Sequence, residues 1–237
     1  MNTTLVSAFI SNSNNRTDRT VDDYFKLARP LLELDQHKII FIESKYQDLI
    51  KSISHPTTQI ILFERNELDF FEEISSTTFQ LPEYRNFEKD TKEYLHLMSN
   101  KTLFCKRAIE LNQNNNFIWL DFGISHILRG EQISSLIKSY YQFNPNKIRI
   151  GGIWSDETSK KYNLFNQINW FFAGGVFGGT PNSILKFYHE SRLQFIKNLS
   201  ENRITWEVNL WRQVYNNQPE LFEIYQADHN QSLILNL

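Results

Sequence analysis

The sequence predicts a layered α/β domain built around a largely parallel sheet, and two observations support this prediction. Short apolar segments that are typical of strands alternate along the chain with longer segments that are typical of helices. In addition, the four apolar residues 117–120 run directly into Asp121, and Gly123 follows two residues later. An uninterrupted apolar run of this kind indicates a strand that is buried in a mostly parallel sheet.

The first half of the chain supplies three strands and two helices to this prediction. A strand at 4–10 ends in a polar loop, 11–19, and Thr20 is placed to cap the helix that follows. The other elements expected here are a helix at 21–34, a strand at 37–43, a short helix at 45–54 and a strand at 59–64. Residues 67–94 fit the alternation least well, and we expect an insertion or a lid there.

The second half continues the alternation. The elements expected are a helix at 99–111, the aspartate strand at 117–120, a helix at 134–143, a strand at 147–153, and helices at 182–198 and 204–216. The sequence shows no repeats and no long linker, so a single domain covering 1–237 is expected, a length at which α/β domains commonly remain undivided.

Composition limits the classes of function. Hydrophobic residues make up 41% of the chain and aromatic residues 14%, so the chain can bury a sizeable core. The formal net charge is −2, which argues against a global basic field that would attract nucleic acid or anionic lipid. The single cysteine, Cys105, excludes an intrachain disulfide and a cysteine zinc site.

The sequence also leads us to expect a cytoplasmic protein. Its first residues lack the basic and apolar regions of a signal peptide, and the longest weakly polar run, 168–179, is too short and glycine-rich to span a bilayer.

Asp121 is the first candidate for chemistry. In open α/β sheets, ligands bind beyond the carboxyl ends of the strands, where this carboxylate is expected to lie. Such a group can hold a divalent cation or a sugar hydroxyl. The alternative is an aspartate that only caps a helix or forms a turn after the strand.

Two further segments carry candidate residues, each with a structural alternative. In 170–179, which reads WFFAGGVFGG, paired glycines such as Gly174 and Gly175 let either a ligand or another backbone approach closely, so a sugar-binding wall and a crowded strand crossing both remain open. In 206–211, which reads WEVNLW, Trp206, Glu207 and Asn209 are residue types that bind sugars. The alternative there is an amphipathic helix with Glu207 directed to water.

Charged residues outside these segments are weaker candidates. Asp228 and His229 form either part of a metal site or a simple surface pair. A diphosphate ligand would need positive charge, and most of the basic residues in front of the sheet are expected to be solvated on helices. These residues are Arg16, Arg19, Arg65, Lys101, Lys106 and Arg107.

Five segments together resemble the HtrL/YibB-like family of bacterial proteins, and the resemblance extends over nearly the whole chain. They are TLVSAF at 4–9, IIFIE at 39–43, IWLDFGI at 118–124, FFAGGVFGG at 171–179 and WEVNLW at 206–211. Members of this family occur near genes for lipopolysaccharide, lipooligosaccharide or capsule assembly, and the family is thought to be related to GT-A glycosyltransferases. The resemblance therefore implies a GT-A-like, Rossmann-like three-layer α/β/α domain.

The same resemblance implies the activity and its partners. It suggests a glycosyltransferase of the hexosyltransferase type, which moves a sugar from a nucleotide-sugar donor to a glycan or glycolipid acceptor, such as lipooligosaccharide, the lipopolysaccharide core or capsule. Such an enzyme would work in the cytoplasm, with peripheral contact to the inner membrane as a further expectation. No nucleic-acid partner is implied.

Carried over position by position, the GT-A pattern matches only in part. Leu120 and Asp121 resemble the first half of the Asp-x-Asp motif that follows a central strand, but Gly123 stands in place of the second aspartate. In the pattern, both carboxylates, often with a C-terminal histidine that His229 resembles by position, help to hold Mn²⁺ or Mg²⁺. Because such hard cations prefer carboxylate and phosphate oxygens, the loss of one carboxylate should weaken a site formed by Asp121 and His229.

The resemblance also gives each candidate a role. Glu207 would be the base that takes the acceptor proton, and Asp121 would bind ribose, the donor sugar or a cation. The nucleotide would lie on Ser7, Ala8, Asn15 and Arg16, and Lys101, Lys106 or His229 would offset the charge of the departing diphosphate. The acceptor and donor sugars would meet at Gly174, Gly175, Trp206 and Asn209.

Two rival functions remain open at this point. A non-catalytic nucleotide-sugar- or glycan-binding protein is supported by the missing second aspartate. A phosphotransferase or phosphatase would use Asp121 as its nucleophile, but that chemistry needs an acid two residues later, where Gly123 stands.

Overall fold

The molecule is organised around one seven-stranded sheet. The computed structural model describes residues 2–11, 19–112, 115–128, 133–138 and 140–237. The strands are β1 (Thr3–Phe9), β2 (Lys38–Ile42), β3 (Thr58–Leu62), β4 (Asn116–Leu120), β5 (Ile148–Gly152), β6 (Phe172–Gly179) and β7 (Phe222–Gln226). Their order across the sheet is β3-β2-β1-β4-β6-β5-β7, which places β4 at the centre. Strand β6 runs antiparallel to both of its neighbours, while the other pairs are parallel.

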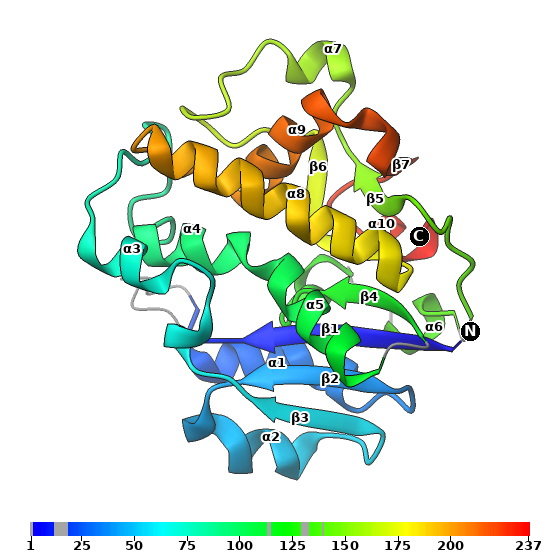
Figure 1. The fold of residues 1–237 in the computed structure, drawn as a ribbon. Coiled ribbons are helices and arrows are strands. Elements are labelled where there is room, and N and C mark those ends of the chain that lie inside the picture. The colour runs from blue at the N-terminus through cyan, green and yellow to red at the C-terminus, as the bar shows by residue number, and fades with distance from the viewer. Residues whose placement is uncertain (1, 12–18, 113–114, 129–132, 139) are drawn as a thin grey trace.

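Helices pack on both faces of this sheet (Figure 1). The helices are α1 (Val21–Leu32), α2 (Gln47–Ile53), α3 (Phe71–Ser76), α4 (Lys92–Ser99), α5 (Lys101–Leu111), α6 (Ile133–Leu136), α7 (Asp156–Ser159), α8 (Pro181–Ser200), α9 (Glu207–Asn217) and α10 (Ser232–Leu235). Buried side chains of α4, α5, α8 and α9 share one core cluster, whereas those of α1, α6 and α10 pack against the opposite strand faces. The predicted α/β class with a mostly parallel sheet is confirmed.

Most of the predicted elements are present because their local signals agree with their tertiary surroundings. All side chains of β2 and β4 are buried, as expected for apolar runs in the interior of a parallel sheet. Strand β3 lies at the sheet edge and is only partly buried. At the start of α1, Thr20 and Asp23 form a reciprocal capping box, which satisfies backbone N–H groups that the first turn would otherwise leave unpaired.

The predicted helix at 134–143 is wrong beyond its first turn. Helix α6 covers only Ile133–Leu136. Tyr141 and Phe143 are instead buried with their rings stacked at a centroid distance of 5.9 Å. Residues two apart do not share a helix face, so the shared burial of these two rings favours an extended backbone over a helix. Phe143 in turn packs where a side chain at Gly178 would otherwise lie.

The segment 67–94, which was expected to be an insertion or a lid, is an irregular connection that packs on the main core. It holds α3, and its residues Leu68 and Ile74 are buried in the same cluster as α5 and α9. A single bridge joins Gln80 to Arg203. The segment leads into α4, whose Tyr94 borders the cavity described below.

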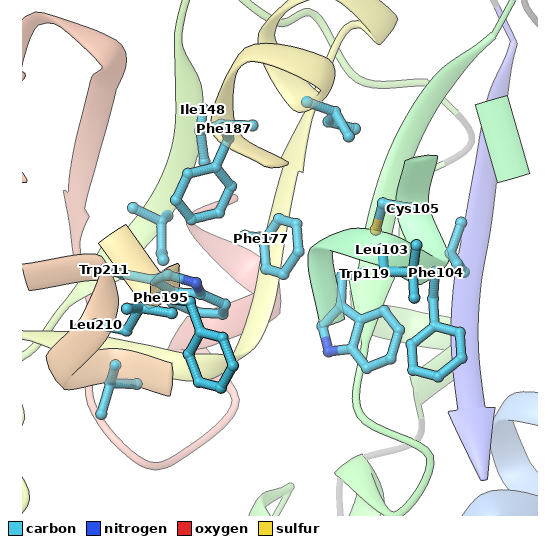
Figure 2. Packing of buried hydrophobic residues seen from close by; sticks show 14 of the residues in the cluster. Leu103, Phe104, Cys105, Trp119, Ile148, Phe177, Phe187, Phe195, Leu210 and Trp211 are labelled. Carbon is cyan, nitrogen blue, oxygen red and sulfur yellow. The ribbon is translucent and has the colours of Figure 1, made fainter. Parts of the chain in front are cut away.

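A line of stacked aromatic rings fixes α5 and α9 relative to the central strands. Phe104 of α5 lies 5.9 Å from the Trp119 ring of β4, which lies 6.3 Å from Phe177 of β6. Phe177 meets Trp211 of α9 edge to face at 5.4 Å. Figure 2 shows Phe177 between the Trp119 and Phe104 rings on one side and the Phe187 and Trp211 rings on the other. The elements that carry Lys101, Asp121, Gly174 and Glu207 are therefore held by one continuous core.

Candidate functional site

A cavity of about 370 Å³ opens beyond the carboxyl ends of β1 and β4. This is the position at which ligands bind in open α/β sheets. Its walls come from the end of β1, the start of α1, the helices α4 and α5, the turn after β4, the first half of β6 with the residues before it, the start of α9, and the C-terminal segment that holds His229 and Leu233. The lining includes Ala8, Phe9, Tyr24, Tyr94, Lys101, Asp121, Trp170, Gly174, Gly175, Trp206, Glu207 and His229.

The centre of the site is a lysine that joins two carboxylates. Lys101 Nζ lies 2.8 Å from Asp121 Oδ1 and 3.1 Å from Oδ2, and it donates to Glu207 Oε1 at 2.9 Å. It also donates to the carbonyl oxygen of Gly174 at 3.0 Å. The three N–H donors of the ammonium are therefore satisfied by three groups, one each from the turn after β4, from β6 and from α9.

Lys101 is charged in this setting although its side chain is only 2% exposed. Burial alone would lower the pKa of its ammonium, but Asp121 and Glu207 raise that pKa above its ordinary value. Lys101 is also the first residue of α5, where a positive charge opposes the helix dipole. The two carboxylates thus override the preference of a helix N-terminus for negative charge. Such a conflict between local preference and tertiary contacts is typical of a functional site.

A break between two helices directs Lys101 into the cavity. Helix α4 ends at Ser99, Asn100 lies between the helices, and α5 begins at Lys101. The Asn100 amide donates to the His96 carbonyl, and its oxygen accepts from the backbone N–H of Asp69. These bonds anchor the junction to the preceding helix and to the segment before α3.

Asp121 presents one restrained oxygen and one freer oxygen. Its Oδ1 accepts from the indole N–H of Trp119 at 2.7 Å and also lies 2.8 Å from the Lys101 ammonium, so two groups of the protein already contact that atom. Its Oδ2 is bonded only to Lys101 within the described part of the chain, and the side chain remains 33% exposed. Asp121 Oδ2 is therefore able to accept a hydrogen bond from a ligand in the cavity.

Glu207 lies in a space that only glycine leaves open. The side chain is 10% exposed and borders the cavity. A methyl group on Gly174 would lie 2.5 Å from Glu207 Oε1 and 3.0 Å from Val208. At Gly175 a methyl group would meet Ile124 at 3.1 Å and Asp121 Oδ2 at 3.7 Å. The first glycine pair of β6 therefore forms the cavity wall, whereas Gly178 and Gly179 are crowded by Phe143 and Ser183.

The other sequence-derived candidates divide into three groups. Ala8, Trp206 and His229 border the cavity with the residues already described. Ser7 is buried outside the lining, Lys106 pairs with Glu110 on the surface of α5, and Asn209 is buried with its amide bonded to the carbonyls of Leu164 and Gln167. Asn15 and Arg16 lie outside the described residues.

The residues present do not fit a divalent cation at Asp121. An ammonium already lies within 3.1 Å of both Asp121 oxygens, and a cation bound beside it would be repelled at short range. His229 stacks edge to face on Trp170 at 4.3 Å, and burial lowers the pKa of its imidazole. Across the described ranges of the chain, no group of three His, Cys, Asp or Glu side chains is arranged to hold a metal ion.

Some cavity residues were not identified from the sequence. Tyr94 lies where burial, and then the charges of Glu207 and Asp121, raise the pKa of its phenol far above the ordinary value. Arg19 and Lys89 bring positive charge to the cavity, and the Arg19 guanidinium lies 5.5 Å from the centre of the Tyr24 ring. Arg19 was among the basic residues noted in the sequence, but Lys89 lies in the irregular connection before α4, and Tyr94 lies on α4, a helix that the sequence did not predict.

Comparison with known proteins places the chain in a family. A family model described as a bacterial protein of unknown function (HtrL_YibB) matches residues 50–234. The chain belongs to the HtrL_YibB family. The match includes the segments that carry Lys101, Asp121, Gly174 and Glu207, so the whole centre of the site lies within it. No curated protein matches the chain. Within the described residues, no helix is long and apolar enough to cross a membrane.

Proposed function

We propose that this HtrL_YibB protein is a nucleotide-sugar-dependent glycosyltransferase with a GT-A-like domain. The observation that supports this most directly is the pair of carboxylates, Asp121 and Glu207, held in an aromatic cavity at the strand ends of a mostly parallel sheet. A volume of about 370 Å³ suits a ligand of nucleotide size. The position of Asp121 after the central strand β4 agrees with the place of the first GT-A aspartate.

The donor nucleotide is assigned to the side of the cavity formed by β1 and α1. Ala8 and Phe9 end β1 there, and Tyr24 of α1 offers an aromatic face for a base. Arg19 and Lys89 are the described cations that border the cavity and are free of the Lys101 cluster, so they are assigned to the diphosphate. Asn15 and Arg16, which lie outside the described residues, keep the nucleotide-binding role predicted for them.

Transfer would then take place between Asp121 and Glu207. Asp121 Oδ2 accepts a hydroxyl of the donor, which fixes the sugar. Glu207 takes the proton from the acceptor hydroxyl while the acceptor oxygen bonds to the anomeric carbon and the bond from that carbon to the diphosphate breaks. Because Lys101 holds Glu207 through Oε1, the second carboxylate oxygen is the one assigned to the proton.

The acceptor is assigned to the opposite side of the cavity. Trp170 and Trp206 border it there with the Gly174–Gly175 wall, and tryptophan faces pack well on the apolar faces of sugars. We assign the acceptor to the class of lipooligosaccharide, lipopolysaccharide core or capsule glycans. The enzyme would use it in the cytoplasm, at the inner membrane.

One observation favours a second function, the non-catalytic binding of nucleotide-sugars or glycans. The ammonium of Lys101 lies 2.9 Å from Glu207 Oε1 and 2.8 Å from Asp121 Oδ1, so both carboxylates already have a counter-ion within the protein. A binding protein needs the cavity and its polar groups but not a base. The two functions therefore differ in donor turnover and not in donor binding.

The experiment that tests the proposal combines binding with turnover. Thermal shift with UDP-, GDP- and CMP-sugars should reveal one donor class, since a ligand at 100 times its Kd stabilises by about 2.7 kcal/mol. The purified protein should then hydrolyse that donor slowly, and Asp121→Asn should abolish the reaction while leaving the melting temperature close to that of the unmutated protein. Binding without any turnover would favour the binding protein. A protein that binds no nucleotide-sugar would refute the glycosyltransferase and would leave only the glycan-binding form of the second function.

A further inference from the structure

We propose that Lys101 is the permanent cation of this site, in the place that a divalent metal ion would otherwise take between Asp121 and Glu207. This inference deepens the proposed function because it states how the site balances charge. Its basis is the set of acceptor oxygens around the Lys101 ammonium, and this arrangement can be examined without any assay of sugar transfer.

The first step is that the ammonium has no donor left for a ligand. Its three N–H groups are taken by Asp121, Gly174 and Glu207 at distances between 2.8 and 3.1 Å. A role for Lys101 as a ligand of the departing diphosphate would require one of these buried bonds to break. Lys101 is therefore a positioning residue, which acts through the carboxylates and not on the substrate.

The second step is that the Lys101 ammonium already binds the oxygen atoms that a metal ion would need as ligands. A hard divalent cation prefers carboxylate and carbonyl oxygens, and the groups around the ammonium are two carboxylates and one backbone carbonyl. The arrangement thus resembles a cation site with the cation already supplied by the chain.

The third step is that the position of the ammonium is fixed from several directions. Lys101 begins α5 at the Asn100 junction, and Phe104 of the same helix is stacked on Trp119. Trp119 also donates to Asp121 Oδ1, so one indole orients both the helix and the carboxylate. A metal ion could exchange with solvent, whereas this cation is part of the folded core.

The test measures metal binding to the purified protein. Mn²⁺ is titrated into the protein alone, and the free ion is followed by electron paramagnetic resonance. Thermal unfolding is measured in parallel with Mn²⁺ and with EDTA. We expect no Mn²⁺ bound at Asp121 and a melting temperature that neither additive changes. Stoichiometric Mn²⁺ that is lost in Asp121→Asn would overturn the inference, whereas Mn²⁺ that Asp121→Asn still binds lies elsewhere and leaves it standing.

Removal of the internal cation gives the sharper result. Lys101→Ala leaves two carboxylates uncompensated and opens the space beside them, so this variant should melt lower and should bind Mn²⁺. At about 100 times its Kd, Mn²⁺ should raise the melting temperature of the variant by about 5–10 °C. The control is Lys106→Ala on the same helix, whose lysine pairs with Glu110 at the surface and which should not respond to Mn²⁺. A folded Lys101→Ala protein that ignores Mn²⁺ would contradict the inference.

Two further measurements keep the outcome decisive. If Lys101→Ala does not fold, the Mn²⁺ titration of the unmutated protein decides on its own. UDP and GDP binding should be the same with Mn²⁺ and with EDTA, and binding that requires Mn²⁺ would count against the inference. If neither nucleotide binds, the proposed function is in doubt, but the titration of Mn²⁺ into the protein alone still tests the role of Lys101.

Discussion

At the scale of single residues, the separate roles of Asp121 and Glu207 follow from how each carboxylate is held. Both are bonded to Lys101, but Asp121 is also bonded to the indole of Trp119, whereas Glu207 Oε1 fills the space beside Gly174. The amide of an Asn or Gln side chain is nearly isosteric with each carboxylate. It differs in carrying no charge and in replacing one acceptor oxygen by a donor. Substitution of each carboxylate by its amide therefore tests the effect of its charge while the shape of the side chain is kept.

Glu207→Gln should lower the turnover number of sugar transfer by about 10²–10⁴-fold and leave donor binding nearly unchanged. The reason is that Glu207 acts on the proton of the acceptor, and a neutral amide cannot take that proton. Steady-state kinetics with varied donor and acceptor concentrations measures both effects. If the acceptor Michaelis constant rises while turnover falls only slightly, Glu207 orients the acceptor and is not the base.

Gly174→Ala should reproduce part of this loss without removing the carboxylate. The added methyl group would overlap with Glu207 Oε1, which lies at the far end of a side chain, so the carboxylate is displaced and the strand is kept. Gly175→Ala is the matched control, since its methyl group meets Ile124 at 3.1 Å and stays 3.7 Å from Asp121 Oδ2. We expect the larger loss of turnover in Gly174→Ala, with both proteins folded by circular dichroism. Equal activities would show that the placement of Glu207 against β6 is unimportant.

The sequence identified these residues one at a time but not their contacts. Asp121 follows a buried strand and Glu207 lies between two tryptophans, and both signals are local. The bonds from Lys101 span 20 residues to Asp121 and 106 to Glu207, and no local pattern contains that information. Asn209 shows the reverse case. It shares a motif with Trp206, but its amide is bonded to carbonyls more than 40 residues away.

At the scale of secondary-structure elements, the junction of α4 and α5 determines where Lys101 points. The histidine of this junction, His96, is 3% exposed, and its Nε2 lies 2.6 Å from the carbonyl oxygen of Asp69. Its ring also stacks on Phe195 of α8 at 6.2 Å. The imidazole therefore ties α4 to the segment before α3 and to α8, in a place where a second proton would be costly.

The stability of the protein should fall in mild acid because of His96. Burial lowers the pKa of this imidazole, while its bond to the Asp69 carbonyl opposes the shift. The unfolded chain, with an ordinary histidine pKa of about 6.5, binds the proton more readily than the folded protein does. The stability that the folded protein gains from keeping His96 neutral is thus fully present above about pH 6.5. It is lost as the pH falls from there through the lowered pKa of the folded state. Each unit of lowering corresponds to about 1.4 kcal/mol.

Denaturant unfolding from pH 5 to pH 8 measures this effect. His96→Gln, which keeps an N–H donor for the carbonyl, should flatten the acid side of the stability curve. His189→Gln is the control, because His189 is exposed on α8. An unchanged curve in His96→Gln would assign the acid loss to other groups, of which His229 is one, since burial lowers its pKa as well.

The elements themselves were largely predictable because strands and helices with uniform burial carry their pattern in the sequence. The failure at 134–143 came from Phe143, which is buried in the space that Gly178 leaves open, and from Tyr141, whose ring is stacked on Phe143. The antiparallel direction of β6 is likewise absent from any local signal, because strand direction is decided by the path of the whole chain.

At the scale of the whole molecule, a single core connects the cavity to global stability. Cys105 lies next to Phe104 on α5, fully buried in the cluster that also contains Trp119, Phe177 and Trp211. Helix α5 is covered by α8 and packs on β1 and β4. A reagent can therefore reach the thiol only when this part of the core opens.

Cys105 should consequently report unfolding of the entire domain. Burial raises the pKa of its thiol, and the thiolate is the reactive form, so the native protein should react with a disulfide reagent far more slowly than the unfolded protein at pH 8. If the thiol reacts through rare opening of the core, the rate follows the population of the open state. A nucleotide-sugar at about 100 times its Kd should then slow the reaction by about a hundredfold. The measurement is the absorbance of the released thiolate, with one equivalent expected in guanidinium. Fast labelling that the ligand does not slow would show that α5 opens locally. That result would contradict the conclusion that one continuous core holds the elements that carry Lys101 and Glu207.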